Sequence, residues 1–157
     1  MSHHKASLSW KCKGPAYLKG QYSREHTWTF DGGLSVPGSS SPSVVPTPWS
    51  NPSGIDPEEA FVASIASCHL LTFLYVAGKA GFQVDSYADD AIGEMSKNDK
   101  GIPWVSLVTL HPRIVYGGER EPTDAEIEHL HHLAHEQCYI ANSVKTEVRV
   151  SRETAVV

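Results

Sequence analysis

The sequence has 157 residues, of which 40% are hydrophobic and 20% are charged, and this composition is typical of one globular domain. Its formal net charge is −5, and no cluster of Lys or Arg offsets it. Both features argue against a nucleic-acid partner or an anionic membrane surface, so small molecules are the expected partners.

The first predicted element is an N-terminal hairpin over residues 5–33. Apolar and polar residues alternate from Ala6 to Cys12 and continue in strand-like fashion from Tyr22 to Phe30. Cys12 belongs to this alternation, and we interpret it as a packing residue. The polar first residues contain no apolar signal region, so we expect a cytoplasmic protein with reduced thiols.

Residues 34–55 are rich in proline and serine and predict an irregular loop. Long loops that carry apolar residues often cover a site. Val45 and Trp49 are therefore candidate lid residues, although a plain surface loop fits the pattern equally well.

A central helix is predicted over residues 57–80. Asp56 is suited to cap it, Pro57 fits the first helical position, and acidic residues follow in the first turn. Apolar residues then occur on nearly every face, which predicts a buried helix with Cys68 at its centre. The segment is too short, and too acidic at its start, to predict a membrane span.

The remaining sequence predicts a second hairpin over 82–117, a helix over 123–138 and a closing strand over 143–152. The whole order predicts one α+β domain with antiparallel pairing instead of a run of parallel βαβ units.

Two of the three cysteines fall on helix faces that are predicted to be buried. Cys68 lies in the central helix, and Cys138 ends the apolar stripe of the second helix. In a reducing compartment, such a pair suits one thiol that reacts and a second thiol that resolves the product. An inert packing role for each remains the alternative at this point.

An ordered set of motifs resembles the OsmC/Ohr family, the osmotically inducible and organic hydroperoxide resistance proteins. The matching residues are Tyr22-Ser23-Arg24-x-His26-Thr27-Trp28, Pro57-Glu58-Glu59, Ala66-Ser67-Cys68-His69-Leu70, Ala134-His135-x-x-Cys138 and Asn142-Ser143. The resemblance extends over nearly the whole chain, from the first hairpin to the last strand.

The resemblance implies two antiparallel sheets around long central helices in an intertwined homodimer. It also implies a thiol peroxidase that reduces alkyl or lipid hydroperoxides and is reset by an external thiol or dithiol, with no cofactor or metal. By position, Cys68 is the peroxidatic cysteine, Cys138 resolves it, and Arg24 and Glu58 activate it. Tyr139 departs from the proline typical of the hydroperoxide-resistance branch, which favours the osmotically inducible branch or an outlying one.

The chemistry independently requires a cation near Cys68, because burial disfavours the thiolate that attacks a peroxide. Arg24 is the best candidate, since a guanidinium stays charged when half buried. Glu58 would orient it through a bidentate ion pair. The Cys68 sulfenic acid would then condense with Cys138 to a disulfide.

Glu58 and Cys68 are ten residues apart, which places them about 15 Å apart along one straight helix. This separation is too long for one compact site. In a two-fold dimer with antiparallel central helices, the start of one helix can approach the middle of the other. We therefore predict that Glu58 serves the Cys68 of the opposite subunit.

Two alternatives from other classes stay open. His131, His135 and Cys138 stand at helical spacing and suit a metal-binding or structural protein. Alternatively, Cys68 would act as the nucleophile of an acyl transferase or hydrolase, with His26 or His135 as its base.

Overall fold

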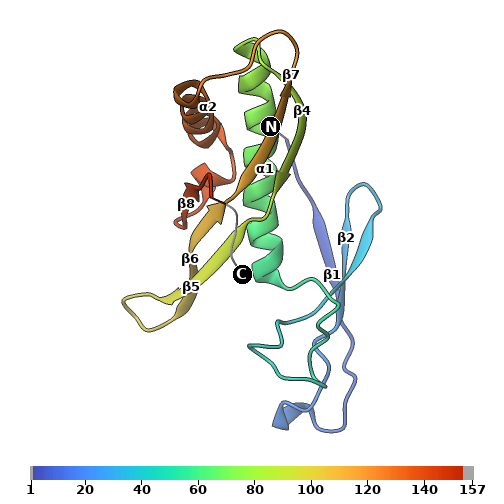
Figure 1. The fold of residues 1–157 in the computed structure, drawn as a ribbon. Coiled ribbons are helices and arrows are strands. Elements are labelled where there is room, and N and C mark those ends of the chain that lie inside the picture. The colour runs from blue at the N-terminus through green and yellow to red at the C-terminus, as the bar shows by residue number, and fades with distance from the viewer. Residues whose placement is uncertain (1, 154–157) are drawn as a thin grey trace. The chain divides into compact units, whose positions relative to one another are not determined.

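The computed structural model describes residues 2–153, which form two compact units, one up to Ala60 and one from Phe61 onward (Figure 1). The two ends of the predicted single domain, residue 1 and residues 154–157, lie outside the described residues. Strands precede one long helix, four more strands follow it, and a second helix and a last strand complete the order. This order confirms the predicted α+β class.

The first unit contains a three-stranded antiparallel sheet in the order β1-β2-β3. The strands are β1 (Ala6–Ser9), β2 (His26–Phe30) and β3 (Ser35–Gly38). Strand β3 occupies the start of the segment predicted to be an irregular loop. Its Pro37 pairs with Thr27, and a proline is tolerated there because β3 is an edge strand.

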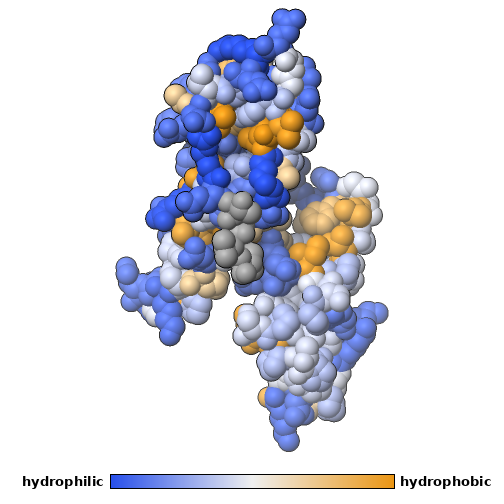
Figure 2. Space-filling view, in the orientation of Figure 1, coloured by the Kyte–Doolittle hydropathy of each residue, from blue (hydrophilic) through white to orange (hydrophobic). Residues whose placement is uncertain are grey.

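One face of this sheet is apolar and open to solvent. Leu8, Trp28 and Val36 are cross-strand neighbours, so their side chains share a face. Leu8 is 68% exposed and Leu34 is 64% exposed, and Figure 2 shows apolar atoms gathered over this sheet. The opposite face carries the serines and threonines of the alternation.

The central helix α1 (Pro57–Lys79) begins where the sequence places its cap. The Asp56 side chain accepts the N–H of Glu59 at 2.7 Å, and the Glu59 carboxylate accepts the N–H of Asp56 at 3.0 Å. This reciprocal pair is a capping box with Asp in place of Ser or Thr. The helix ends before Gly81, whose φ of 83° is the left-handed conformation typical of a helix stop.

Helix α1 is buried on one side only, which corrects the prediction of a fully buried helix. Its inward stripe follows helical spacing and consists of Ile65, His69, Phe73, Val76 and Ala77. On the opposite side, Leu71 is 63% exposed and Tyr75 is 55% exposed. By length and composition alone the helix could cross a membrane, but a core helix of a soluble protein meets the same criterion.

The second unit divides the predicted long hairpin into two sheets. The strands are β4 (Gln83–Asp89), β5 (Ile92–Lys97), β6 (Pro103–Leu110) and β7 (Pro112–Gly117). Strand β4 pairs with β7 and β5 pairs with β6, both antiparallel. The division falls at His111, between the end of β6 and the start of β7, where its backbone N–H donates to Asp89 Oδ1 at 2.7 Å.

The last strand, β8 (Glu147–Val150), pairs parallel with β6, so one pair departs from the predicted antiparallel pattern. It begins later than residue 143 because a 3-10 turn, η2 (Ala141–Ser143), occupies the start of the predicted strand. This turn connects the second helix to β8.

Helix α2 (Asp124–Gln137) starts at a capping box between Thr123 and Glu126 and lies beside α1 in Figure 1. Both helices and the β4–β7 sheet share one core, made of Phe73, Val76, Ala77, Phe82, Leu130 and Ala134. This packing holds the end of α2 against the middle of α1. It thereby positions the two cysteines predicted to act together.

Candidate active site

Cys68 and Cys138 are neighbours within the second unit. Cys68 is half-buried on α1, one residue from the inward-facing His69. Cys138 caps the C-terminus of α2 and is 1% exposed. Both thiols are free in the structure.

Backbone N–H groups from the turn after α2 point at both sulfurs. The N–H of Ile140 donates to Cys68 Sγ at 3.5 Å, and the N–H of Ala141 donates to Cys138 Sγ at 3.4 Å. A hydrogen bond to the charged form of a group favours that form. The turn therefore supplies Cys68 with a donor suited to a nucleophilic thiolate.

The two thiols are electrostatically unequal. Burial, and after it the contact with Cys68, raises the pKa of Cys138 to about 11. Cys138 therefore keeps its proton near neutral pH. Of the two sulfurs, Cys68 is also the more accessible one, so it is the better placed to meet a substrate.

A groove of about 990 Å³ opens beside Cys68. One wall is a face of α1 and the other is the end of α2 with the turn that follows. The lining residues are Ser64, Ser67, Cys68, Leu71, Thr72, Tyr75, Glu136, Gln137, Tyr139, Ile140 and Asn142. Its larger apolar side chains can hold an organic group while Cys68 lies at the wall.

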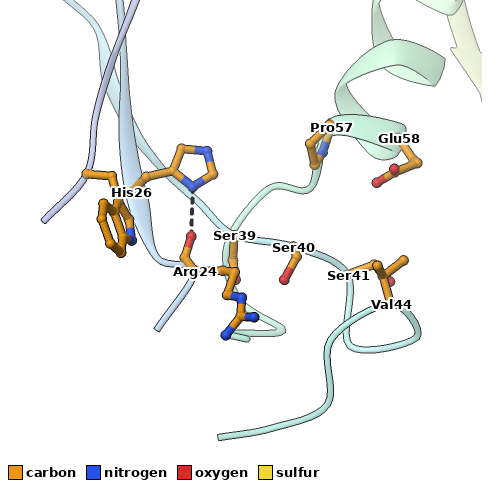
Figure 3. A pocket seen from close by; sticks show the side chains of 9 residues that line it. Arg24, His26, Ser39, Ser40, Ser41, Val44, Pro57 and Glu58 are labelled. Carbon is orange, nitrogen blue, oxygen red and sulfur yellow. Dashed lines mark hydrogen bonds between the residues drawn. The ribbon is translucent and has the colours of Figure 1, made fainter. Parts of the chain in front are cut away.

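Arg24 and Glu58 lie together in the first unit, around a cavity of about 250 Å³. Figure 3 shows them on different sides of this cavity, with Ser39, Ser40 and Ser41 between them. The predicted site is therefore present as two separate pairs. Cys68 and Cys138 are neighbours in the second unit, and Arg24 and Glu58 line one cavity in the first. Val44 lines this cavity, whereas the predicted lid residues Val45 and Trp49 do not.

The Arg24 guanidinium is held by backbone carbonyls. Its Nη1 donates to the carbonyl oxygens of Gly20 at 2.6 Å and Tyr22 at 2.5 Å, and the group stacks on the Tyr22 ring at 3.7 Å. Among residues 2–153, no ion pair joins Arg24 to Glu58, so the predicted bidentate pair is not formed within the chain.

His26 is fixed next to Arg24 with both ring nitrogens in use. Trp28 Nε1 donates to His26 Nε2 at 2.5 Å, and an indole N–H is only a donor. His26 Nδ1 therefore carries the proton and donates it to the Arg24 carbonyl at 2.8 Å. Because neither nitrogen is free to accept a proton, His26 does not fit the base of an acyl transferase.

The candidate metal ligands on α2 do not converge. His131 is buried and shares a 3.0 Å hydrogen bond with His69, while His135 is exposed and Cys138 bonds within the turn. Within the described part of the chain, no group of three His, Cys, Asp or Glu side chains is arranged to hold a metal ion. His131 and Cys138 are buried while His135 is exposed, and Cys138 lies past the last residue of α2, so the three side chains do not share one site.

Sequence reasoning missed the turn that contacts both sulfurs. Its donors are backbone N–H groups, which no residue type reveals. The adjacent Asn142 and Ser143 stood in the matching motifs without a role, and both bind carbonyl oxygens of this turn.

Comparison with known proteins was made for the sequence and for the fold. The sequence model of the OsmC-like proteins matches residues 50–153. The chain belongs to the OsmC family. A comparison with curated proteins gives no match.

Solved structures of OsmC-family proteins share this fold. An OsmC-like protein of unknown function from Vibrio cholerae is 51% identical, with a TM-score of 0.92 over 96% of this chain and 99% of that one. An organic hydroperoxide resistance protein OsmC from Legionella pneumophila is 18% identical, with a TM-score of 0.69 over 96% of each chain. The organic hydroperoxide resistance protein OhrB of Bacillus subtilis is 19% identical, with a TM-score of 0.62 over 93% of this chain and 96% of that one.

Proposed function

We propose that this OsmC-family protein is a cysteine-based peroxidase that reduces organic hydroperoxides to alcohols. The observation that carries the proposal is the contact between a half-buried Cys68 and a buried Cys138 at the wall of a partly apolar groove. Membership of a family that includes organic hydroperoxide resistance proteins supports the same reaction class.

In the first step, the Cys68 thiolate attacks the distal oxygen of the hydroperoxide. The O–O bond breaks, the alkoxide takes up a proton and leaves as an alcohol, and Cys68 becomes a sulfenic acid. The Ile140 N–H keeps a donor on the attacking sulfur throughout this step. The sulfur loses two electrons, and the peroxide gains them.

In the second step, Cys138 attacks the sulfur of the sulfenic acid. The Cys138 thiol proton goes to the departing hydroxyl, which leaves as water, and a Cys68–Cys138 disulfide forms. A resting Cys138 thiol is a poor competitor for the peroxide, and its sulfur becomes the nucleophile as it gives up the proton that the departing hydroxyl takes. An external dithiol or thiol then returns both cysteines to thiols, as a reducing cytoplasm allows.

The lining of the groove supports this substrate class. The apolar part of the groove is formed by Leu71, Tyr75, Tyr139 and Ile140. An alkyl or lipid tail would bury apolar surface against these side chains, whereas hydrogen peroxide has no such tail. Tyr139 is 84% exposed at the place where a proline is typical of the hydroperoxide-resistance branch. Its ring adds apolar area next to the resolving cysteine.

We also propose a homodimer, because two large apolar surfaces of the chain face solvent. One is the outer side of α1 at Leu71 and Tyr75, and the other is the face of the β1–β2–β3 sheet around Leu8 and Leu34. Exposed apolar patches of this kind mark interaction surfaces. A second copy would complete the wall of the groove at Leu71 and Tyr75, cover the sheet face, and bring Glu58 of one chain to Cys68 of the other.

Turnover of the cysteine variants tests the proposed reaction. With a dithiol reductant, Cys68→Ser should lose hydroperoxide reduction. Cys138→Ser should consume about one equivalent and then stop as a sulfenic or overoxidised acid. Normal turnover by Cys138→Ser would remove Cys138 from the mechanism, and normal turnover by Cys68→Ser would remove the proposed function itself.

A further inference from the structure

Two side chains that have no role in the proposed mechanism hold the turn between α2 and β8 in place through hydrogen bonds. Asn142 Nδ2 donates to the carbonyl oxygens of Glu136 and Cys138, each at 2.9 Å. Ser143 Oγ donates to the carbonyl oxygen of Tyr139 at 2.7 Å. The last carbonyls of a helix lack intrahelical partners, and these two residues satisfy three carbonyls at this end of α2.

The Ser143 bond acts on the same peptide group that contacts Cys68. The carbonyl of Tyr139 and the N–H of Ile140 belong to one peptide unit, and that unit is planar. Ser143 holds the carbonyl end, so it also fixes the direction of the N–H that donates to Cys68 Sγ.

The bonds of Asn142 act on the preceding peptide unit, which contains the carbonyl of Cys138. Its side chain and its backbone N–H both bind the Cys138 carbonyl, at 2.9 and 3.0 Å. These bonds close the turn that presents the Ala141 N–H to Cys138 Sγ. Asn142 therefore holds the buried cysteine where it contacts Cys68.

We infer that Asn142 and Ser143 are positioning residues for the two sulfurs, Ser143 for the reactivity of Cys68 and Asn142 for the approach of Cys138. The inference rests on the proposed function, since it assigns separate steps of that reaction to the two residues. Neither residue reacts, and each acts through a backbone group.

Two variants test the role of Ser143. Ser143→Ala removes the hydroxyl, and Ser143→Thr keeps it. One net hydrogen bond corresponds to about a threefold to tenfold change, so Ser143→Ala should slow iodoacetamide alkylation of Cys68 at pH 7 by that factor while Ser143→Thr stays near the parent. Equal rates in all three proteins would refute the role of Ser143.

Asn142→Asp keeps the shape of the side chain but removes both donors. It should slow Cys68–Cys138 disulfide formation roughly tenfold beyond any change in the alkylation rate of Cys68, which is measured on the same variant. With excess tert-butyl hydroperoxide, more Cys68 should then reach the sulfinic acid. Asn98→Asp is the matched control, because the Asn98 side chain only accepts hydrogen bonds here and an aspartate can keep them.

Disulfide formation is measured by mass spectrometry with two oxidants, tert-butyl hydroperoxide and diamide, which takes two electrons and two protons from a pair of thiols. If Asn142→Asp matches Asn98→Asp with both oxidants, the positioning role of Asn142 is refuted. If diamide forms the disulfide with the expected dependence on Asn142 while the hydroperoxide does not oxidise the parent, the proposed function fails and the positioning roles stand.

Discussion

His69 Nε2 and His131 Nδ1 lie 3.0 Å apart and share one hydrogen bond between α1 and α2. The two imidazoles are 1% and 7% exposed. One nitrogen must donate and the other must accept, so the bond requires that these two nitrogens carry a single proton between them. The bond joins the helices that carry Cys68 and Cys138.

The histidine pair makes stability depend on pH. Burial, and after it the neighbouring charges, lowers the pKa of His69 and of His131 to about 4. An unfolded histidine binds its proton near pH 6.5, so the unfolded state holds more protons between about pH 6.5 and 4. The stabilisation is present above this window and is lost as the pH falls through it.

We expect the free energy of unfolding to drop by several kcal/mol from pH 7 to pH 4. Denaturant unfolding at a series of pH values measures this drop, and His69→Leu combined with His131→Leu should flatten it. Histidine NMR titrations give a direct check. Midpoints above pH 6 for both rings would contradict the account of this pair.

Arg24 is expected to raise the nucleophilicity of Cys68 through its charge. Arg24→Ala should therefore slow alkylation of Cys68 near pH 7 far more than at high pH, where the thiolate forms without help. Arg24→Lys should restore the rate only partly, because lysine keeps the positive charge but lacks the planar guanidinium that stacks on Tyr22. The same alkylation rate in variant and parent at every pH would make Arg24 an ordinary arginine.

Glu58 is expected to serve the Cys68 of the partner subunit. Chains with Cys68→Ser and chains with Glu58→Gln are refolded together, so that a mixed dimer holds one complete site. Hydroperoxide reduction should then exceed that of either parent. If Glu58 works within its own chain, the mixture stays at the level of the Glu58→Gln protein.

Gly38 leaves the space that the Trp28–His26 pair occupies. A Cβ at this position would overlap Trp28 Nε1 and lie 2.7 Å from His26 Nε2. Gly38→Ala should cost about 1–3 kcal/mol of unfolding free energy, because neither ring can move without breaking its hydrogen bonds. Gly32→Ala is the control, since a Cβ there meets nothing within 4 Å.

The sequence predicted elements whose signals are local. Capping residues mark the start of α1 at Asp56 and of α2 at Thr123, and alternation marks β1 and β2. The exposed side of α1 was not predictable, because an apolar face looks the same whether its own chain or another surface covers it. The motif also included Asn142 and Ser143, but their bonds to carbonyl oxygens depend on the path of the turn.

Cys68 and Cys138 are proposed to form one redox pair. Mass spectrometry of the reduced protein before and after one equivalent of an alkyl hydroperoxide tests it most directly. Both free thiols should be lost and a Cys68–Cys138 disulfide should appear, with Cys12 unchanged. Two intact thiols after exposure, or a disulfide that excludes Cys138, would contradict it.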